Sequence, residues 1–143
     1  MSAGLTAKKA DTAIPVAVEA DASKAVTVTT GAFHQVAHAT KGTATIAEDS
    51  QGNRTLTLRG FKTSDGPQLR LYLYKAEDVK DNATAKKLVA GKQFVNLGAL
   101  KSTSGTQTYS VPKGIDLWQY LAVGVWCDKF DVNFGTAPLS SPQ

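Results

Sequence analysis

The sequence contains a single cysteine among its 143 residues, and its first 30 residues contain no aromatic side chain. One thiol excludes a disulfide within the chain and every zinc or iron–sulfur site that several cysteines build. No apolar run approaches the ~20 residues of a membrane-spanning helix, so the chain is not expected to cross a membrane. The signatures GxSxG, GxxxxGK(S/T) and GxGxxG are also missing, which removes the commonest hydrolase and nucleotide-binding classes.

The formal net charge is +4, from 16 basic and 12 acidic residues. Much of the excess lies in residues 75–92, a lysine-rich stretch without the interleaved aromatic side chains that stack on bases. A lysine cluster of this kind is typical of a solvated face. The basic balance therefore does not predict a nucleic acid as partner.

The first 30 residues differ in composition from the rest of the chain, because they include eight alanines and none of the eleven aromatic residues. Such a segment cannot bury enough apolar surface to order itself, so residues 1–30 are predicted to be a mostly flexible leader or linker. Within it, the alternating Val26 and Val28 make 26–29 the part most able to pair with a strand. We expect the compact domain over 31–139 and a C-terminal tail at 140–143.

An alanine-rich leader before a compact domain is typical of envelope and secreted proteins. No charged-then-apolar secretion signal follows Met1, but a chain trimmed to its mature form would look the same. We therefore expect an extracytoplasmic location (secreted, periplasmic or cell-surface), with any envelope anchor in an N-terminal segment missing from this sequence.

From Gly31 onward the sequence has the pattern of an all-β protein. Short runs of alternating apolar and polar residues are separated by glycine, aspartate, asparagine and serine. Eight such runs with tight turns predict a single antiparallel β-sandwich. The runs are 32–38, 43–48, 54–59, 69–74, 94–98, 107–111, 120–127 and 129–134. Residues 75–93 interrupt this alternation of apolar and polar residues. Their lysine- and alanine-rich composition allows one short helix on an excursion from the sheet.

Three aromatic side chains fall on faces directed away from the core. The run 69–74 alternates leucines with Arg70, Tyr72 and Tyr74, which predicts a half-buried strand with a polar-aromatic outer face. By the same alternation Trp126 lies on a non-core face. These rings could stack on a sugar or a porphyrin, or a second sheet could cover them, which is the more usual arrangement.

Cys127 closes the apolar run 121–127. Alternation places its side chain on the same face as three aliphatic residues of this run, which favours a buried, inert thiol. The residue also lies at a strand end, where it could surface at the rim of a sandwich beside Asp128 and Lys129. There the ammonium group would favour the thiolate and the carboxylate would oppose it. The residues alone leave both interpretations open.

His34 and His38 have HxxxH spacing, which on a helix would bring both imidazoles to one metal. Their surroundings predict a strand, in which four residues span ~13 Å, too far for two ring nitrogens to share an ion at ~2 Å. We therefore expect no metal pair, and a surface position for His34. Either imidazole could still serve as one haem ligand or as a base near the thiol. A Cys–His hydrolase is not favoured, because no glycine-rich oxyanion segment surrounds Cys127.

Four stretches, in order, carry a resemblance to a known family: GAFHQVAHATKGTATI (31–46), LTLRGFKTSDGPQLRLYL (56–73), FVNLGALKSTSGTQTYSVP (94–112) and YLAVGVWCDKFDVNFGTAPL (120–139). Together they resemble the DM-thirteen domain, also called the electron-transfer DM domain, which is related to the DOMON β-sandwiches. The last block, an apolar strand into WC, then KF, FG and AP, is the most specific. Gln68 departs from the family, in which an acidic residue commonly follows the Gly-Pro pair.

The resemblance implies a cell-surface or secreted module with a role in extracellular electron transfer. In the family that role rests on a characteristic cysteine, which acts as a bare thiol or holds a prosthetic group such as haem. This cysteine matches Cys127, and the histidine before the first glycine turn matches His38. Cys127 is thus the candidate redox thiol, and Cys127 with His38 are the candidate haem-binding or thiol-partner residues.

We therefore expect an extracytoplasmic redox, electron-transfer or ligand-binding module centred on Cys127, without independent catalytic activity. Because the chain has no second cysteine, a redox role by thiol alone needs a partner protein, a small thiol or a dimer. The alternative is a structural adhesion or carbohydrate-binding module of the cell envelope, in which Cys127 merely packs. A thiol titration of the native protein and its visible spectrum distinguish these hypotheses.

Overall fold

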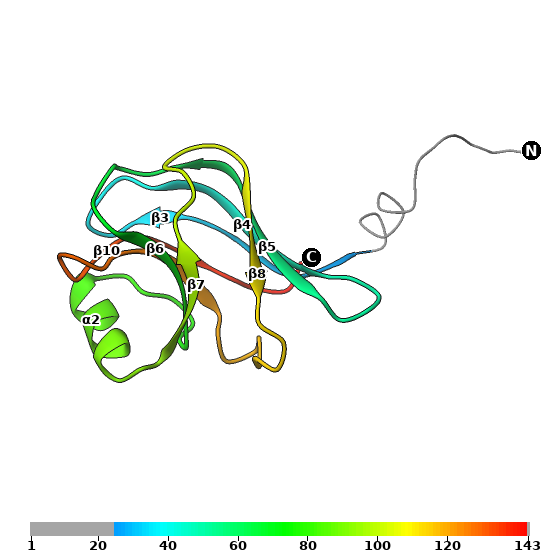
Figure 1. The fold of residues 1–143 in the computed structure, drawn as a ribbon. Coiled ribbons are helices and arrows are strands. Elements are labelled where there is room, and N and C mark those ends of the chain that lie inside the picture. The colour runs from blue at the N-terminus through cyan, green and yellow to red at the C-terminus, as the bar shows by residue number, and fades with distance from the viewer. Residues whose placement is uncertain (1–24, 143) are drawn as a thin grey trace, which may run out of the picture.

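The computed structural model describes residues 25–142, and within this range it contains nine strands and one helix (Figure 1). The elements are β2 (Val26–Ala32), β3 (His34–Gln35), β4 (Lys41–Glu48), β5 (Arg54–Lys62), β6 (Leu69–Tyr74), α2 (Asn82–Ala90), β7 (Phe94–Ala99), β8 (Gln107–Val111), β9 (Ala122–Cys127) and β10 (Val132–Pro138).

The strands form two sheets that pack as a sandwich. The four-stranded sheet has the order β2-β4-β5-β8, and the five-stranded sheet has the order β3-β10-β9-β6-β7. Every strand pair within the two sheets is antiparallel. The predicted all-β sandwich with one short helix is confirmed.

The core between the sheets follows the period-2 alternation of the sequence. On β4 and β5, buried aliphatic residues alternate with threonines that point away from the core. Facing aliphatic residues come from β6 and β9 of the other sheet, so that one apolar cluster fills the sandwich. Its fully buried aliphatic members are Ala44, Ile46, Leu56, Leu58, Leu71, Leu73, Val123, Val125 and Ala137.

The outer face of the five-stranded sheet is buried as well. Tyr72, Tyr74 and Trp126 lie on this face in a second apolar cluster with Ala85 of α2. The Tyr72 ring stacks on the Trp126 ring, with ring centroids 5.9 Å apart. The prediction of a half-buried strand at 69–74 is therefore wrong. The aromatic residues do point away from the core, but a helix covers them rather than a second sheet or a stacking ligand.

Helix α2 lies on the excursion between β6 and β7, where a short helix was expected (Figure 1). Asp81 caps its N-terminus, because the Asp81 side chain accepts a 2.8 Å hydrogen bond from the Thr84 amide. The helix ends at Gly91, whose amide bonds back to the Lys87 carbonyl. No helix within residues 25–142 has the length and apolar character needed to span a bilayer.

The ordered domain begins before the expected boundary at Gly31. Residues 1–24 of the predicted leader lie outside the described residues, whereas Val26–Ala32 forms the edge strand β2 and pairs with β4. The run VTVTT explains this strand, because β-branched residues fit a pleated, half-buried surface. The leader therefore contributes its last residues to the four-stranded sheet.

Two predicted strands differ most from the structure in their boundaries. The run 32–38 is divided, because the chain passes from one sheet to the other between β2 and β3. The run 129–134 starts too early: Asp128–Asp131 form the turn, and β10 extends to Pro138. Asp131 has φ +54°, a left-handed conformation that suits a turn rather than a strand.

The C-terminal end of the domain pairs with β2. The Thr30 amide donates to the Ser140 carbonyl at 2.9 Å, and the Ser140 amide donates back to Thr30 at 3.0 Å. Gly31 makes the crossing feasible, because a Cβ atom at this position would lie 1.7 Å from the Pro138 carbonyl oxygen. Ser140 of the predicted tail 140–143 thus belongs to the packed structure.

Candidate functional site

Cys127 is the last residue of β9 and lies in the interior of the sandwich. Its neighbours across the sheet are Leu69 on β6 and Val132 on β10. The side chain is completely buried within the main apolar cluster. Its Sγ atom donates a hydrogen bond to the Pro67 carbonyl at 3.1 Å. The strand end thus brings the thiol to the rim of the core, where a loop closes over it.

Residues 63–68 form this loop, which we call the cover loop. It is tied to the strand end, because the Asp128 amide donates to the Gln68 carbonyl at 3.0 Å. Gly66 lies against the Phe134 ring, and a Cβ atom there would come within 2.9 Å of the ring carbon Cζ. Gln68 has φ +54°, which disfavours most side chains. The cover loop is therefore closely packed yet locally strained.

A cavity of about 410 Å³ lies on the outer side of the cover loop. Cys127 does not line it, but Leu69, its cross-strand neighbour, does. Arg70 and Lys101 bring two positive charges to its wall, and Asp65 brings one negative charge. The full lining is Asp65, Gly66, Gln68, Leu69, Arg70, Ala99, Leu100, Lys101, Ser102 and Thr103.

His38 lies in the connection between β3 and β4 and is exposed to solvent. Its ring stands edge-on to the Phe134 ring, with ring centroids 4.2 Å apart. Within residues 25–142 no hydrogen bond joins its imidazole to the Cys127 thiol, whose bond goes to Pro67. The structure brings both predicted site residues near the cover loop and Phe134, but it does not bring them together.

His34 was expected at the surface, but it is half-buried on β3 and paired with Asp78. The distance from His34 Nε2 to Asp78 Oδ1 is 2.7 Å, and Nδ1 lies 3.1 Å from the Gln35 carbonyl. Burial acts to lower the pKa of His34, but these two hydrogen bonds outweigh it and raise the pKa above its ordinary value. The imidazolium form is therefore favoured, because each ring nitrogen faces an acceptor.

The sequence did not single out Asp78 as a partner for His34. The two residues are 44 positions apart, and the acidic residues of the excursion resemble ordinary solvated charges. Within residues 25–142 no group of three or more histidine, cysteine or acidic side chains is placed to hold a metal. The HxxxH spacing therefore belongs to one ion-paired and one exposed histidine.

The geometry around Cys127 does not fit a haem. An axial ligand must present its donor atom to iron at an open porphyrin face, whereas Sγ is fully enclosed by core side chains and the Pro67 carbonyl. His38 is exposed, with its ring edge-on to Phe134, and it is not joined to the Cys127 thiol, so the two residues do not form one ligand pair. The enclosed Sγ leaves no room for a planar macrocycle, and we derive no chemistry through one.

Comparisons with known proteins support the resemblance carried by the sequence. A family model described as Electron transfer DM13 matches residues 32–139, which is most of the chain. No curated protein and no solved structure shows a match. The matched range begins at the last residue of β2 and runs through β10, so it includes Cys127, His38 and the cover loop.

Proposed function

Because the chain belongs to the DM13 electron-transfer family, we propose that it is an extracytoplasmic redox module whose electron-carrying group is the Cys127 thiol, gated by the cover loop. The observation that carries the proposal is the position of Sγ at a strand end, sealed by the Pro67 carbonyl. Release of this one hydrogen bond and displacement of residues 65–68 would connect the thiol to the neighbouring cavity.

The chemistry is thiol–disulfide exchange. The Cys127 thiol loses its proton to solvent, and the thiolate attacks one sulfur of a partner disulfide. A new S–S bond forms between Cys127 and that sulfur, while the partner's S–S bond breaks and its second sulfur leaves as a thiolate. This step oxidises Cys127 and reduces the departing sulfur of the partner. A thiolate of a second small thiol or protein then attacks the partner's sulfur in the mixed disulfide, forms a disulfide with it and releases the reduced Cys127 thiolate.

The charges around the cavity indicate the kind of partner. Arg70 and Lys101 line it with two positive charges against the one negative charge of Asp65, a balance that would attract carboxylates. The partner is therefore a small disulfide that carries carboxylates, such as oxidised glutathione, or a redox protein with an acidic rim. Two copies of this chain could also form a disulfide between them.

The test is the rate at which a disulfide reagent, dithiobis(nitrobenzoate), labels Cys127 in the folded protein. If the cover loop opens locally, labelling proceeds in native buffer, and its rate changes little with urea below the unfolding transition. If the thiol is reached by global unfolding alone, the rate rises with urea as steeply as the unfolding equilibrium does. The second result would overturn the gated-thiol proposal. Cys127→Ser provides the blank.

A variant of the cover loop sharpens this test. Gly66→Ala places a methyl group against the Phe134 ring, so the closed conformation of the loop should lose stability. A loss of ~1 kcal/mol in the free energy of loop opening would accelerate labelling about fivefold. Gly91→Ala is the matched control, because it is the same substitution at the end of α2, away from the thiol. Equal labelling rates in both variants and the unaltered protein would contradict gating by this loop.

The complete burial of Cys127 supports one second candidate: a structural or carbohydrate-binding module of the cell envelope in which the cysteine only packs. Under this alternative, native labelling is absent and oxidised glutathione forms no mixed disulfide on the folded protein. Cys127→Ser would then destabilise the domain by ~1–3 kcal/mol, because a hydroxyl replaces a thiol among aliphatic side chains.

A further inference from the structure

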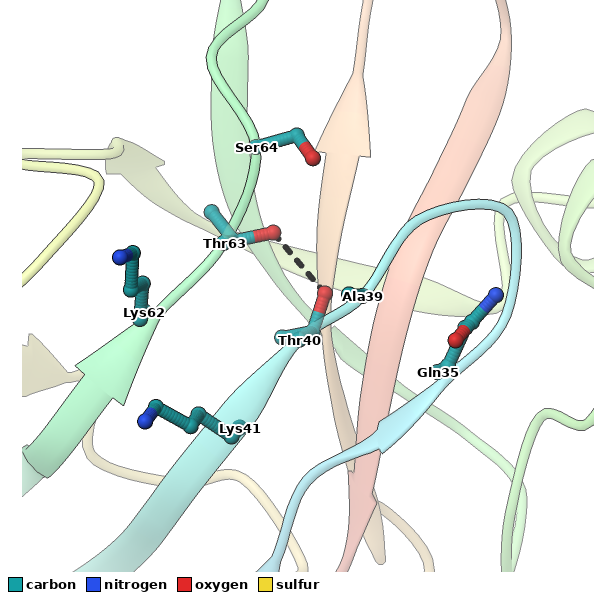
Figure 2. A pocket seen from close by; sticks show the side chains of 7 residues that line it. All are labelled: Gln35, Ala39, Thr40, Lys41, Lys62, Thr63 and Ser64. Carbon is teal, nitrogen blue, oxygen red and sulfur yellow. Dashed lines mark hydrogen bonds between the residues drawn. The ribbon is translucent and has the colours of Figure 1, made fainter.

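A second cavity, of about 330 Å³, lies at the end of the four-stranded sheet where β4 begins and β5 ends. Figure 2 shows its lining residues, which come from three segments of the chain. Gln35 and Ala39 belong to β3 and the connection that follows, Lys41 opens β4, and Lys62 closes β5. The complete lining is Gln35, Ala39, Thr40, Lys41, Lys62, Thr63 and Ser64.

The charge of this cavity is entirely positive. Lys41 and Lys62 are direct cross-strand partners, and Figure 2 shows their ammonium ends extending to the same side. Like charges opposite each other destabilise a strand pair. No carboxylate lines the cavity, and within residues 25–142 neither lysine belongs to an ion pair. Asp65, the nearest acidic residue along the chain, lines the other cavity instead.

A bulge in the sheet produces this pairing of lysines. The register shifts between Lys41 and Thr43, because two residues of β5, Gly60 and Phe61, lie opposite the single residue Gly42 of β4. Gly42, with φ +116°, makes the bulge feasible, since a Cβ atom there would lie 2.7 Å from the Phe61 Cα atom. Bulges redirect side chains and are frequent beside functional sites. The sheet thus departs from regular pairing at the point where it places two cations together.

The floor of the cavity is a pair of buried hydroxyls. Thr40 Oγ1 lies 2.9 Å from Thr63 Oγ1 and donates to the His38 carbonyl, so Thr63 donates to Thr40 and both protons are used. Within residues 25–142, the side chains of Ser64 and Gln35, which also line the cavity, make no hydrogen bond. The cavity therefore offers a ligand two cations and a floor with no acidic group.

We propose that this cavity binds a small organic anion, a carboxylate on a compact apolar body, with the carboxylate between Lys41 and Lys62. The carboxylate offsets the repulsion of the paired ammonium groups, while the apolar body lies against the lysine stems, Ala39 and the threonine methyl groups. The site shares Thr63 and Ser64 with the cover loop but does not include Cys127, so the Cys127→Ser protein tests it separately from the redox proposal.

The first experiment compares three probes of nearly equal shape by calorimetric titration of the whole chain at low salt. Benzoate should bind, whereas neutral benzamide should bind at least about tenfold more weakly and benzylammonium should not bind. Amide resonances of Thr63 and Ser64 should shift with benzoate in NMR spectra. Equal binding of benzoate and benzamide, or shifts confined to other parts of the domain, would overturn the proposal.

The second experiment removes the charges. The double variant Lys41→Gln with Lys62→Gln should weaken benzoate binding at least about tenfold, because it removes both cations and keeps the side-chain stems. The control, Lys86→Gln with Lys87→Gln on α2, has the same change of net charge and should bind as the unaltered protein does. Equal losses in the two double variants would mean that net charge alone attracts the probe, which would overturn a defined site.

Discussion

The two sheets of the sandwich differ in what covers their outer faces. In the four-stranded sheet, Thr30, Thr45, Thr57 and Thr108 stand in register across all four strands, on the face away from the core. In the five-stranded sheet, the corresponding face of β6 and β9 carries the aromatic cluster under α2. The four-stranded sheet is therefore packed on one face, against the core, whereas the five-stranded sheet is packed on both faces, against the core and against α2.

This difference originates in a single connection. The link between β6 and β7 is long enough to carry α2 across the sheet, whereas β4 and β5 are joined by a tight turn at 49–53. A strand that is buried on both faces has few positions where a polar side chain is tolerated. Every residue of β9 is buried, whereas β4 and β5 keep the alternation of a half-buried sheet.

The largest expected effect comes from truncating the covered face. Trp126→Ala should lower the free energy of unfolding by ~3–5 kcal/mol, because the side chain is buried between the sheet and α2. Thr57→Ala, on the uncovered face of the other sheet, should change it by less than ~0.5 kcal/mol. Urea denaturation monitored by far-UV circular dichroism measures both. Similar losses in the two variants would remove the distinction between the faces.

A smaller effect is expected from a polar contact within the covered face. The Tyr74 hydroxyl donates a 3.1 Å hydrogen bond to Asn133 Oδ1, and both side chains are buried. Tyr74→Phe should cost ~1–3 kcal/mol, because the buried amide oxygen loses its donor. Tyr120→Phe is the control, since Tyr120 is only partly buried and its hydroxyl has no hydrogen bond among the described residues. Equal stability of the two variants would contradict this prediction.

The smallest effect concerns the point where the excursion is fastened to the opposite edge of the five-stranded sheet. His34 on β3 and Asp78 ahead of α2 form that contact, and the pKa of His34 is raised. A raised pKa stabilises the fold at pH values below the unfolded pKa, and the stabilisation is lost as the pH rises through the folded pKa. Because solvent screens this partly exposed pair, we expect less than ~1 kcal/mol.

The measurement is the free energy of unfolding at pH 5.5 and pH 8 for the unaltered protein and for His34→Gln. The difference between the two proteins should be larger at pH 5.5, where the imidazolium is present in both the folded and unfolded chains. His38→Gln is the control, because His38 is exposed and has no ion pair within the described residues. A difference that does not change with pH would argue against the His34–Asp78 contact as a source of stability.

The sequence predicted the sandwich because alternation and turn residues are local signals. The runs at 69–74 and 107–111 coincide with β6 and β8, and the run at 54–59 begins with β5, which extends three residues further to Lys62. Alternation also placed Cys127 on the core face, where the structure buries it. These features depend on neighbours in the chain, and a period of two residues is enough to reveal them.

The environment of the candidate site could not be predicted in the same way. Whether Cys127 is open or closed depends on Pro67, 60 residues away, and the pairing of His34 with Asp78 joins positions 44 residues apart. The cover over Tyr72 and Trp126 comes from a helix whose own sequence shows only that it is short and polar. Such contacts depend on the topology, which brings distant segments together without any local signal.

The backbone pairing of Thr30 with Ser140 affects how the domain would respond to a force that pulls its N- and C-terminal ends apart. Because the segments are antiparallel, the chain before Thr30 and the chain after Ser140 leave the pair in the same direction. A force that pulls these two ends apart would therefore load the two hydrogen bonds one after the other rather than both at once. The two ends of the described domain are therefore held together by a contact that resists separation weakly and one bond at a time.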